Sequence, residues 1–511
     1  MKDLLLGIDM GTTGSKSALF TDRGCMVSVG QAEYLTRHEH PGWAEQNPEE
    51  WWDALCVATR HALSGVDAGP ERIAGIAVSS QAPTMLPLDH LGQPVRPALI
   101  WMDRRAEAEA QGLKQTFGEH CVEDITGNRP DPFYVAAKIQ WYRAHEPGQF
   151  AETSLFVQAN GYINFRLTGR HALDSVHAAL LQLRDYQREQ WSEQLCKACG
   201  VDPAHFPPVR PCHNILGEVT RDAAEATGLR RGTPVMVGTV DGAAAALESG
   251  ALSSGTAAEM TGTSTVLLMP ASQRVTEPVF IAMPHCVPGT YLLLGAMAAS
   301  GACLRWFRDQ FGEPEPHHVP KHTANAYDLL TQEASRVCPG SGGVVFLPYM
   351  MGERSPIWHT NARGVFFGLT LSTTRDAMVR AILEGTAFAL LHNVEHARRA
   401  GITLHEIRSV GGGTKSALWN QIKADVLGVP ILLPETSVGA PFGDAILAGM
   451  GLGIYTDVDE CLKTMVRIRG RYDPDLKNHQ YYGKLYRVFR SIYENLRSVF
   501  DKAAAIDGNQ R

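Results

Sequence analysis

A short polar segment, Asp9-Met10-Gly11-Thr12-Thr13, follows an apolar run at residues 4–8. A carboxylate, a glycine turn and two hydroxyls at the end of a strand are suited to binding the phosphates of a nucleotide and their magnesium ion. Asp9 would hold the metal, and Lys16 is close enough in sequence to add a positive charge. The alternative is an ordinary hairpin, in which these side chains only satisfy the backbone groups of the turn.

A second turn of the same kind occurs in the other half of the chain. Gly262-Thr263-Ser264 lies between residues 257–260 and an apolar run at residues 266–269. One such turn is a weak signal, because glycine turns are common. Two of them, one in each half, favour a duplicated nucleotide-binding fold.

Two further segments could take part in phosphoryl transfer. Gly411-Gly412-Gly413 lacks side chains, so a flat group such as adenosine could approach its backbone, or the loop could simply connect a strand to a helix. Asp241 follows a buried strand and opens a helix of small residues, either as a carboxylate aimed into a crevice or as a helix N-cap. Phosphoryl transfer requires a base near the incoming hydroxyl and neutralisation of phosphate charge. The residues that could fill these roles are Asp9, Lys16, Thr263 and Asp241.

The elements that must position these residues alternate between strands and helices. The first half is predicted to have strands at residues 4–9, 17–20, 26–29, 73–78, 85–88 and 235–238. Its predicted helices are one through residues 51–63, with Asn47 as its N-cap and Pro48 at its first position, and one from 243. The second half is predicted to have strands around Gly262 and at 291–294 and 407–410, and helices at 298–310, 374–399 and 416–427. Hairpins that precede strand–helix units indicate mixed sheets, and ligands of such α/β folds bind at the strand ends.

The length of 511 residues favours two domains, and the boundary is predicted between residues 246 and 255. The expected domains are residues 1–248 and residues 249–511. A net charge of −7 without a block of basic residues gives no electrostatic footprint for nucleic acid or an anionic membrane, so a small-molecule partner is expected.

The sequence has neither an apolar run long enough to span a membrane nor a signal-peptide core, so a cytoplasmic location is expected. Cys196 and Cys199 have a spacing that suits zinc or redox chemistry, but no second pair accompanies them. They are therefore predicted to be unpaired thiols of a helix, in a reducing compartment. His317, His318 and His322 lie in a proline-rich loop and are predicted to be solvated.

Taken together, these segments resemble the FGGY family of carbohydrate kinases, and within it most of all the xylulokinases. The resemblance extends from Leu5 to about Gly453, and many matches occur in the same order. The motifs that carry it are Gly7-Ile8-Asp9-Met10-Gly11-Thr12-Thr13, residues 43–52 (WAEQNPEEWW), residues 100–105 (IWMDRR), residues 347–356 (LPYMMGERSP), residues 364–369 (GVFFGL) and Gly411-Gly412-Gly413.

The resemblance implies two ribonuclease H-like, actin-like ATPase domains that close on ATP and a sugar held in the interdomain cleft. Asp241 matches the catalytic base of the family, and Asp9 matches the carboxylate near Mg²⁺, which it would contact directly or through water. The N-terminal domain would bind the sugar and part of the phosphates, and the C-terminal domain would bind the adenine nucleotide. The positions implied for ATP are Thr12, Thr13, Lys16, Thr263, Gly301, Arg305, Gly412 and Ser416. Those implied for the sugar are Ser80, Gln81, Asp103, Phe133 and Asp241.

The sequence departs from its relatives on the sugar side. Xylulokinases share a Met-His pair where this chain has Ser80-Gln81, and the residue after the base is usually Asn or Gln, whereas here it is Gly242. Recognition of a sugar depends on such individual polar partners. A ketopentose such as xylulose is the first expectation, followed by another ketose, a polyol or a sugar acid.

Two other classes of function fit a nucleotide-binding fold of this kind. One is an actin-like or chaperone-like ATPase that switches conformation, and the other is a sugar sensor without catalysis. An assembly ATPase would not need the sugar-side segments around Gln81 and Asp103, and a sensor would not need both Asp9 and Asp241. The resemblance is also compatible with a homodimer.

Overall fold

The computed structural model describes residues 3–67, 69–311, 324–435 and 438–508. These residues form two compact units, and both units are built from separate stretches of chain. The first unit comprises Met1–Leu252, Ala271–Leu292 and Val438–Arg467, and the second comprises Ser253–Pro270, Leu293–Ser437 and Ile468–Arg511. Within the described residues, no helix combines the length and the apolar character that a membrane span requires.

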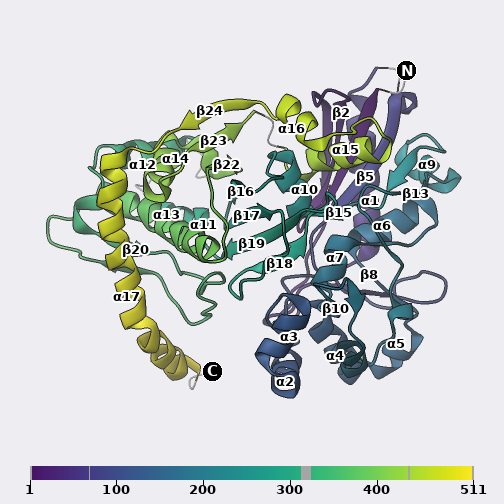
Figure 1. The fold of residues 1–511 in the computed structure, drawn as a ribbon, viewed down its shortest axis with the longest axis horizontal. Helices are drawn as coiled ribbons and strands as arrows, with labels where there is room; N and C mark the ends of the chain where they lie inside the picture. Colours follow the sequence, from purple (N-terminus) through teal and green to yellow (C-terminus); the bar gives the residue numbers. More distant parts are fainter. Residues whose placement is uncertain (1–2, 68, 312–323, 436–437, 509–511) are drawn as a thin grey trace. The chain divides into compact units, whose positions relative to one another are not determined.

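The first unit is organised around a mixed sheet (Figure 1). Its strands β1 (Leu4–Met10), β2 (Gly14–Thr21) and β3 (Met26–Glu33) form an antiparallel meander, as predicted. On the other side of β1, strand β5 (Ile73–Ser80) runs parallel to it. Beside β5 lie β14 (Pro234–Met236) and β15 (Thr239–Val240), both parallel to it, and β13 (Ile215–Glu218) pairs with β14.

Helices cover both faces of this sheet. Helix α1 (Pro48–Ser64) packs on β2 and β3, and the side chain of Asn47 caps it by accepting a hydrogen bond from the Glu49 backbone N–H, as the sequence predicts. Helix α15 (Ala440–Gly451) packs on β1 and β5 from the opposite face and also touches α10 (Asp241–Glu248). A Cβ at Gly7 would lie 1.8 Å from the Pro441 carbonyl oxygen, and one at Gly443 would lie 1.9 Å from the Ala244 carbonyl oxygen. Glycine at these two positions therefore lets α15 approach both elements closely.

The rest of the first unit extends the core of the sheet and also forms a second core, around residues such as Leu99, Ile139, Tyr142 and Leu181. Its helices are α2 (Glu107–Phe117), α3 (Glu119–Thr126), α4 (Val135–His145), α5 (Pro147–Glu152), α6 (Ala159–Thr168), α7 (Ser175–Leu180), α8 (Glu193–Cys199), α9 (Arg221–Thr227) and α16 (Val458–Met465). Its short strands are β4 (Glu45–Gln46), β6 (Leu86–Leu88), β7 (Ala98–Leu99), β8 (Leu155–Val157), β9 (Leu173–Asp174), β10 (Arg184–Asp185), β11 (Gln190–Trp191), β12 (Val209–Arg210) and β18 (Ile281–Pro284).

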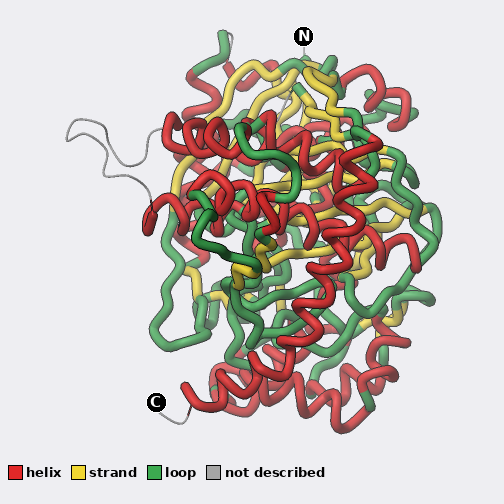
Figure 2. The backbone as a smooth tube through the Cα atoms, turned by 90° about the vertical axis from the view of Figure 1, so that its left-hand side faces the viewer, coloured by secondary structure: helices red, strands yellow, loops and turns green. Residues whose placement is uncertain are grey.

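The second unit repeats the arrangement of the first sheet. Strands β16 (Thr256–Thr261) and β17 (Thr265–Ala271) form an antiparallel hairpin, and β22 (Glu406–Val410) runs parallel to β16, as β5 does to β1. The neighbouring strands follow the order β19 (Tyr291–Met297), β17, β16, β22, β23 (Ile431–Pro434) and β24 (Ile468–Tyr472), and a separate pair is formed by β20 (Val345–Leu347) and β21 (Val365–Phe367). The helices of this unit are α11 (Gly301–Phe311), α12 (Ala324–Ser335), α13 (Arg375–Arg399), α14 (Ala417–Leu427) and α17 (Leu476–Gly508), of which α17 is the longest described helix (Figure 2).

Three of the element boundaries that differ from the prediction lie next to the predicted site residues. Strand β5 continues through Ser79 and Ser80, which were expected in a loop, because both residues pair with β15. The strand predicted at residues 235–238 is interrupted at Gly238, whose φ of +81° requires glycine, and helix α10 then begins at Asp241 rather than at Ala243. Helix α11 begins at Gly301 rather than at Ala298, because the Ala298 backbone N–H donates to the carboxylate of Glu353 instead of opening a helix.

Candidate active site

The polar residues predicted near the sugar and the phosphates lie where three parallel strands of the first unit end. In the register of the sheet, Asp9 of β1 pairs with Ser79 of β5, and Ser79 pairs with Thr239 of β15. Asp241 directly follows β15. Because parallel strands end at the same edge of a sheet, Asp9 and Asp241 lie close enough to influence each other electrostatically.

Asp9 has an incomplete set of partners. Its side chain is half-buried, and its Oδ1 atom has no hydrogen-bond partner among the described residues. Desolvation, and secondly the negative charge of Asp241, raise the pKa of Asp9 to about 7, and the nearby ammonium of Lys16 opposes this rise. A buried carboxylate oxygen without a donor is suited to a hard cation such as Mg²⁺. No cluster of three or more His, Cys, Asp or Glu side chains that could hold a metal by itself occurs in the described part of the chain, so a cation here would need ligands from phosphate or water.

Asp241 is the first residue of α10, and the N-cap position belongs to Val240. Its Oδ1 atom accepts a hydrogen bond of 2.6 Å from the Gly242 backbone N–H. Desolvation raises the pKa of Asp241 to about 6, while the Gly242 N–H and the imidazole of His177 lower it. A half-buried carboxylate with such a pKa can take up a proton near neutral pH, as a general base must.

The turn after β1 presents two hydroxyls and is held from several sides. The Gly11 backbone N–H donates to the Gly14 carbonyl, and Thr13 is exposed. Thr12 Oγ1 accepts a hydrogen bond of 3.0 Å from Trp101 Nε1, and its carbonyl accepts one of 2.7 Å from a side-chain amide. Lys16 Nζ donates to the Val438 carbonyl at 2.9 Å. The hydroxyl of Thr13 is thus the most accessible polar side chain of the turn.

Two of the predicted sugar-side residues are buried at the end of β5. Gln81 Nε2 donates to Gln46 Oε1 at 2.6 Å, and Gln81 Oε1 has no partner among the described residues. Ser80 Oγ lies 3.3 Å from His177 Nε2. The free amide oxygen of Gln81 is an acceptor that a substrate hydroxyl or a water could satisfy.

Asp103 and Phe133 lie in different surroundings. Asp103 is fully buried, and its carboxylate accepts hydrogen bonds from the Ala44 backbone N–H at 2.7 Å and from the guanidinium of Arg105 at 2.8–3.0 Å. Phe133 is half-buried, and its carbonyl accepts from Lys138. Direct sugar contacts from these two residues stay predictions, and Asp103 would first have to release internal partners.

The residues predicted for the nucleotide in the second unit gather around one pocket of about 580 Å³. It is lined by all five of them, namely Thr263, Gly301, Arg305, Gly412 and Ser416. The remaining lining residues are Gly262, Leu304, Tyr327, Asp328, Thr331, Gly413, Lys415 and Trp419. A pocket of this size, with glycine-rich walls and a few polar side chains, has the dimensions of a small-molecule site.

The geometry of this pocket depends on close backbone contacts. A Cβ at Gly301 would lie 2.3 Å from the Gly262 carbonyl oxygen, so glycine is needed where α11 meets the turn after β16. Arg305 Nη2 donates to Thr263 Oγ1 at 3.2 Å. Ser416 caps α14 by accepting a hydrogen bond from the Trp419 backbone N–H at 3.2 Å, which leaves its hydroxyl proton available.

Several residues at these sites escaped the sequence analysis. In the first unit, Asp444 of α15 is fully buried, accepts a hydrogen bond from Ser79 Oγ at 2.7 Å, and has a pKa raised well above its usual range by desolvation. Glu248 accepts hydrogen bonds from the Val438 and Gly439 backbone N–H groups, and desolvation raises its pKa to about 8. A single acidic residue inside the apolar stretch at residues 440–451 was the available signal for Asp444. In the second unit, Tyr327 and Asp328 of α12 carry no motif that would have marked them.

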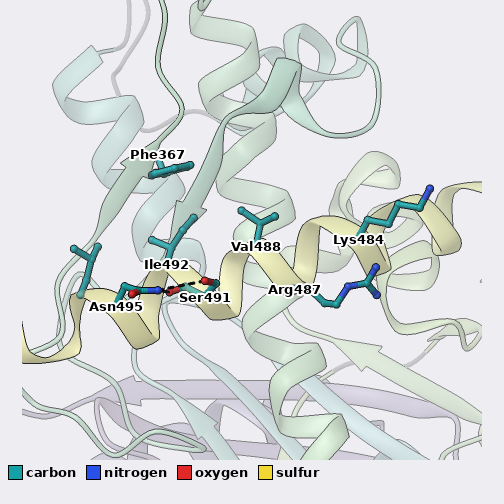
Figure 3. A pocket seen from close by; sticks show the side chains of 8 residues that line it. Phe367, Lys484, Arg487, Val488, Ser491, Ile492 and Asn495 are labelled. Atoms are coloured by element: carbon teal, nitrogen blue, oxygen red, sulfur yellow. Dashed lines mark hydrogen bonds between the residues drawn. The ribbon is translucent and has the colours of Figure 1, made fainter.

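Other features of the structure stand apart from these sites. All ten cysteines lie in described parts of the chain as free thiols, and desolvation raises the pKa of Cys196 to about 11 and that of Cys199 to about 12, as expected for unpaired thiols in a helix. His317, His318 and His322 lie outside the described residues. A further pocket of the second unit runs along α17 between Lys484 and Leu496 and is bounded by Phe367 (Figure 3). None of the predicted site residues lines it.

Comparisons with known proteins agree with this architecture. The N-terminal domain model of the FGGY family of carbohydrate kinases matches residues 4–248, and its C-terminal domain model matches residues 257–452. The chain is 30% identical to the xylulose kinase of Bacillus subtilis over 97% of both chains, and 28% identical to the gluconokinase of the same organism over 99% of this chain and 98% of that one.

Solved structures give the same result. The crystal structure of xylulose kinase from Rhodospirillum rubrum superposes with a TM-score of 0.90 at 31% identity, covering 98% of this chain and 100% of that chain. The two α/β units with mixed sheets therefore have the actin-like ATPase fold of these sugar kinases. The chain belongs to the FGGY family of carbohydrate kinases, and it is a phosphotransferase that acts on a small sugar-like substrate.

Proposed function

We propose that this kinase transfers the γ-phosphoryl group of ATP to a hydroxyl of a free ketopentose such as xylulose. The observation that carries the proposal is that Asp9 and Asp241 lie at the same edge of the sheet, at the ends of the two strands on either side of β5, where Asp241 has a pKa raised to about 6 and Asp9 has an unpartnered oxygen. Similarity to proteins named xylulose kinase, at 30–31% identity over nearly the whole chain, supports xylulose as the first substrate to test.

The reaction that we propose is a direct transfer of the phosphoryl group from ATP to the sugar. Asp241 accepts the proton of the sugar hydroxyl, the freed oxygen attacks the γ-phosphorus, and the bond between that phosphorus and the leaving oxygen of ADP breaks. Thr12, Thr13 and Lys16 would hold the phosphates through hydroxyls, backbone N–H groups and one positive charge. Mg²⁺, held near Asp9 directly or through water, would neutralise phosphate charge.

The second unit would hold the adenosine part of ATP in its pocket of about 580 Å³. In this proposal Gly412 lets the flat base lie against the backbone, and the hydroxyl of Ser416 faces the adenosine. Thr263 and Arg305 would lie nearer the phosphates, beside the backbone of Gly301. The proposed division of labour therefore follows the expected domains, with sugar and catalytic base in residues 1–248 and nucleotide in residues 249–511.

On the sugar side, Gln81 is the strongest candidate because its Oε1 atom is buried without a partner among the described residues. Ser80, Asp103 and Phe133 would shape the same region, with Asp241 as the group that meets the reacting hydroxyl. Gly242 offers no side-chain amide, so this chain would recognise its sugar with one polar group fewer than its xylulokinase relatives.

A sugar acid is the second candidate, because the relatives include proteins named gluconokinase that are 28% identical over nearly the full length. Another ketose or a polyol would fit the same chemistry. We further propose a cytoplasmic location, where ATP is available and ten free thiols are stable, and a homodimer as an assembly to test.

The test is a panel of D-xylulose, D-ribulose, D-gluconate, glycerol and erythritol, assayed for ADP release with Mg²⁺ and ATP. The proposal predicts release well above the background hydrolysis rate with one of these, and D-xylulose gives the highest kcat/KM. If D-gluconate gives the highest value, the substrate is a sugar acid. If none raises ADP release, the ATPase-switch or sensor functions take the place of the kinase reaction.

A further inference from the structure

A buried ring of hydrogen bonds lies directly behind the catalytic base. Asp174 Oδ2 lies 2.6 Å from His177 Nδ1, and His177 Nε2 lies 3.3 Å from Ser80 Oγ. Asn160 closes the ring, because its backbone N–H donates to Ser80 Oγ at 3.1 Å and its Nδ2 donates to Asp174 Oδ2 at 3.1 Å. All four side chains are at most 2% exposed.

The ring has a fixed geometry. Asp174 is the N-cap of α7, and its Oδ1 atom accepts hydrogen bonds from the Val176 and His177 backbone N–H groups. Since the Asp174 carboxylate accepts the proton on Nδ1, Nε2 is the imidazole atom that faces Ser80. The imidazole is therefore held by Asp174 at Nδ1, and its Nε2 faces Ser80 at the end of β5.

The ring is joined to the base through the sheet. Ser80 pairs with Val240 in the parallel register of β5 and β15, and Asp241 is the next residue. The imidazole of His177 also acts on the carboxylate of Asp241 electrostatically. His177 lies in none of the motifs described above, and the sequence predicts no binding or catalytic role for it.

We propose that His177 is a positioning residue for phosphoryl transfer, which acts through Ser80 and the end of β15 to fix the direction in which Asp241 faces the sugar hydroxyl. The inference rests on the proposed function, because it assigns a task within that reaction. Displacement of a catalytic group by about 1 Å can lower the rate on the order of 10²-fold. Loss of a rigid support behind the base should therefore lower kcat measurably.

The alternative is that His177 only satisfies hydrogen bonds in a core. His359 provides a matched control for that role, because it is also buried and, within the second unit, its Nε2 lies 2.9 Å from the carboxylate of Asp501 and its Nδ1 lies 3.1 Å from the hydroxyl of Tyr493. A core role predicts that both histidines affect stability alone. A positioning role predicts a kinetic effect at His177 only.

The experiment uses H177N, H177Q and H359N in the full chain, with the sugar that the panel selects. Asparagine at 177 keeps an amide that can face Asp174 but does not reach Ser80. We expect kcat to fall by about 10- to 100-fold in H177N, while the KM for ATP changes by less than about 2-fold. H359N should retain wild-type kcat at a temperature where it is folded.

A double-mutant cycle with D241N supplies the decisive readout. If His177 acts through the base, H177N should have little further effect on the residual kcat of D241N, so the two effects will not add. Additive effects, or an unchanged kcat in H177N and H177Q, would overturn the inference. Should both variants at 177 fail to fold, S80A removes one hydroxyl of the ring and carries the same test, with a loss of kcat expected and an unchanged kcat contradicting the proposal. Absence of sugar-dependent ADP release in the wild-type protein would instead refute the proposed function itself.

Discussion

The hairpin β1–β2 of the first unit and the hairpin β16–β17 of the second have the same strand pairing, but they differ in the partners of one carboxylate. Asp9 of β1 and Glu259 of β16 each lie near the end of the first hairpin strand, and each pairs with a serine of the adjacent parallel strand, Ser79 or Ser409. Glu259 is fully buried, forms a 2.8 Å ion pair with Lys423, and accepts hydrogen bonds from the hydroxyls of Thr261 and Ser409. Asp9 is half-buried, and its Oδ1 atom has no such partner in the described chain.

The difference is between a carboxylate that is fully paired inside the protein and one that is not. The ion pair with Lys423 satisfies Glu259 inside the protein and ties β16 to α14, so its carboxylate is not available to a ligand. In the first unit desolvation raises the pKa of Asp9 to about 7, which means that the nearby ammonium of Lys16 compensates its charge only in part. A ligand that supplies positive charge would provide the missing compensation.

The turns differ in a corresponding way. After β1 the Gly11 backbone N–H donates to the Gly14 carbonyl, whereas after β16 the Gly262 N–H donates to the Ser264 carbonyl, one residue closer along the chain. The second turn is also held by α11, because the Ala302 N–H donates to the Thr263 carbonyl at 3.0 Å. The second hairpin is therefore fixed as a wall of the pocket, whereas in the first turn Thr13 is exposed.

Among changes to the two hairpins, the largest effect is expected for D9N, which removes the charge and keeps the shape of the side chain. We expect kcat to fall by about 10²- to 10³-fold, the range for the loss of a preorganised electrostatic contact. The free energy of unfolding should stay the same or rise, since no internal partner is lost. Kinetics and urea unfolding of the same preparation test both statements, and a stability loss as large as that of E259Q would remove the contrast between the hairpins.

The next effect concerns stability, in the second hairpin. E259Q leaves the ammonium of Lys423 buried without its counter-ion, so we expect a loss of about 3 kcal/mol or more in the free energy of unfolding. The control is the double variant E259Q/K423M, which removes both charges and should recover most of the loss. Urea unfolding curves decide the matter, and a loss below about 1 kcal/mol in E259Q would mean that the ion pair contributes little.

A smaller effect is expected in the pH dependence of the reaction, and it arises from the two carboxyls of the first unit. Asp241 must be ionised to accept a proton, and its pKa is raised to about 6 while that of the neighbouring Asp9 is raised to about 7. The kcat/KM for the sugar should therefore fall as the pH drops below about 6 to 7, by about tenfold per pH unit. The profile between pH 4.5 and 8.5 tests this, and an acid limb near pH 4 would show that these carboxyls have ordinary pKa values.

The smallest effect is expected for R305A, which removes the hydrogen bond to Thr263 at the exposed edge of the pocket in the second unit. We expect the KM for ATP to rise by about 3- to 10-fold with the KM for the sugar unchanged, consistent with the loss of one solvent-accessible contact. R336A, an exposed arginine outside the pocket, is the matched control. Equal changes in both KM values would indicate a general defect rather than a nucleotide contact.

Local signals predicted much of the fold. The meander at the N-terminus, the Asn47 cap of α1 and the helix at residues 375–399 follow from turn residues, capping residues and periodicity within short windows. The glycine turns and loops that line the pocket of the second unit were also predicted, because glycine at such positions reports a close backbone approach.

Long-range packing could not be predicted in the same way. Residues 438–467 belong to the first unit, where Gly7 and Gly443 allow α15 to approach β1 and α10 closely. The sequence around either glycine gives no indication of which distant segment it contacts. The ring of Asn160, Asp174, His177 and Ser80 joins three separate segments, so no local pattern marks it. Strand β5 extends through Ser80 because β15 pairs with it from a distant part of the chain.

The central claim is that Asp241 is the base of a sugar kinase, and the most direct measurement compares D241N with the wild-type protein. The account predicts that sugar-dependent ADP release falls by about 10²- to 10⁴-fold in D241N, because an amide cannot accept the proton of the hydroxyl. ATP affinity, measured by calorimetry, should change by less than about twofold. Turnover within about threefold of the wild-type value in a folded D241N would contradict the account.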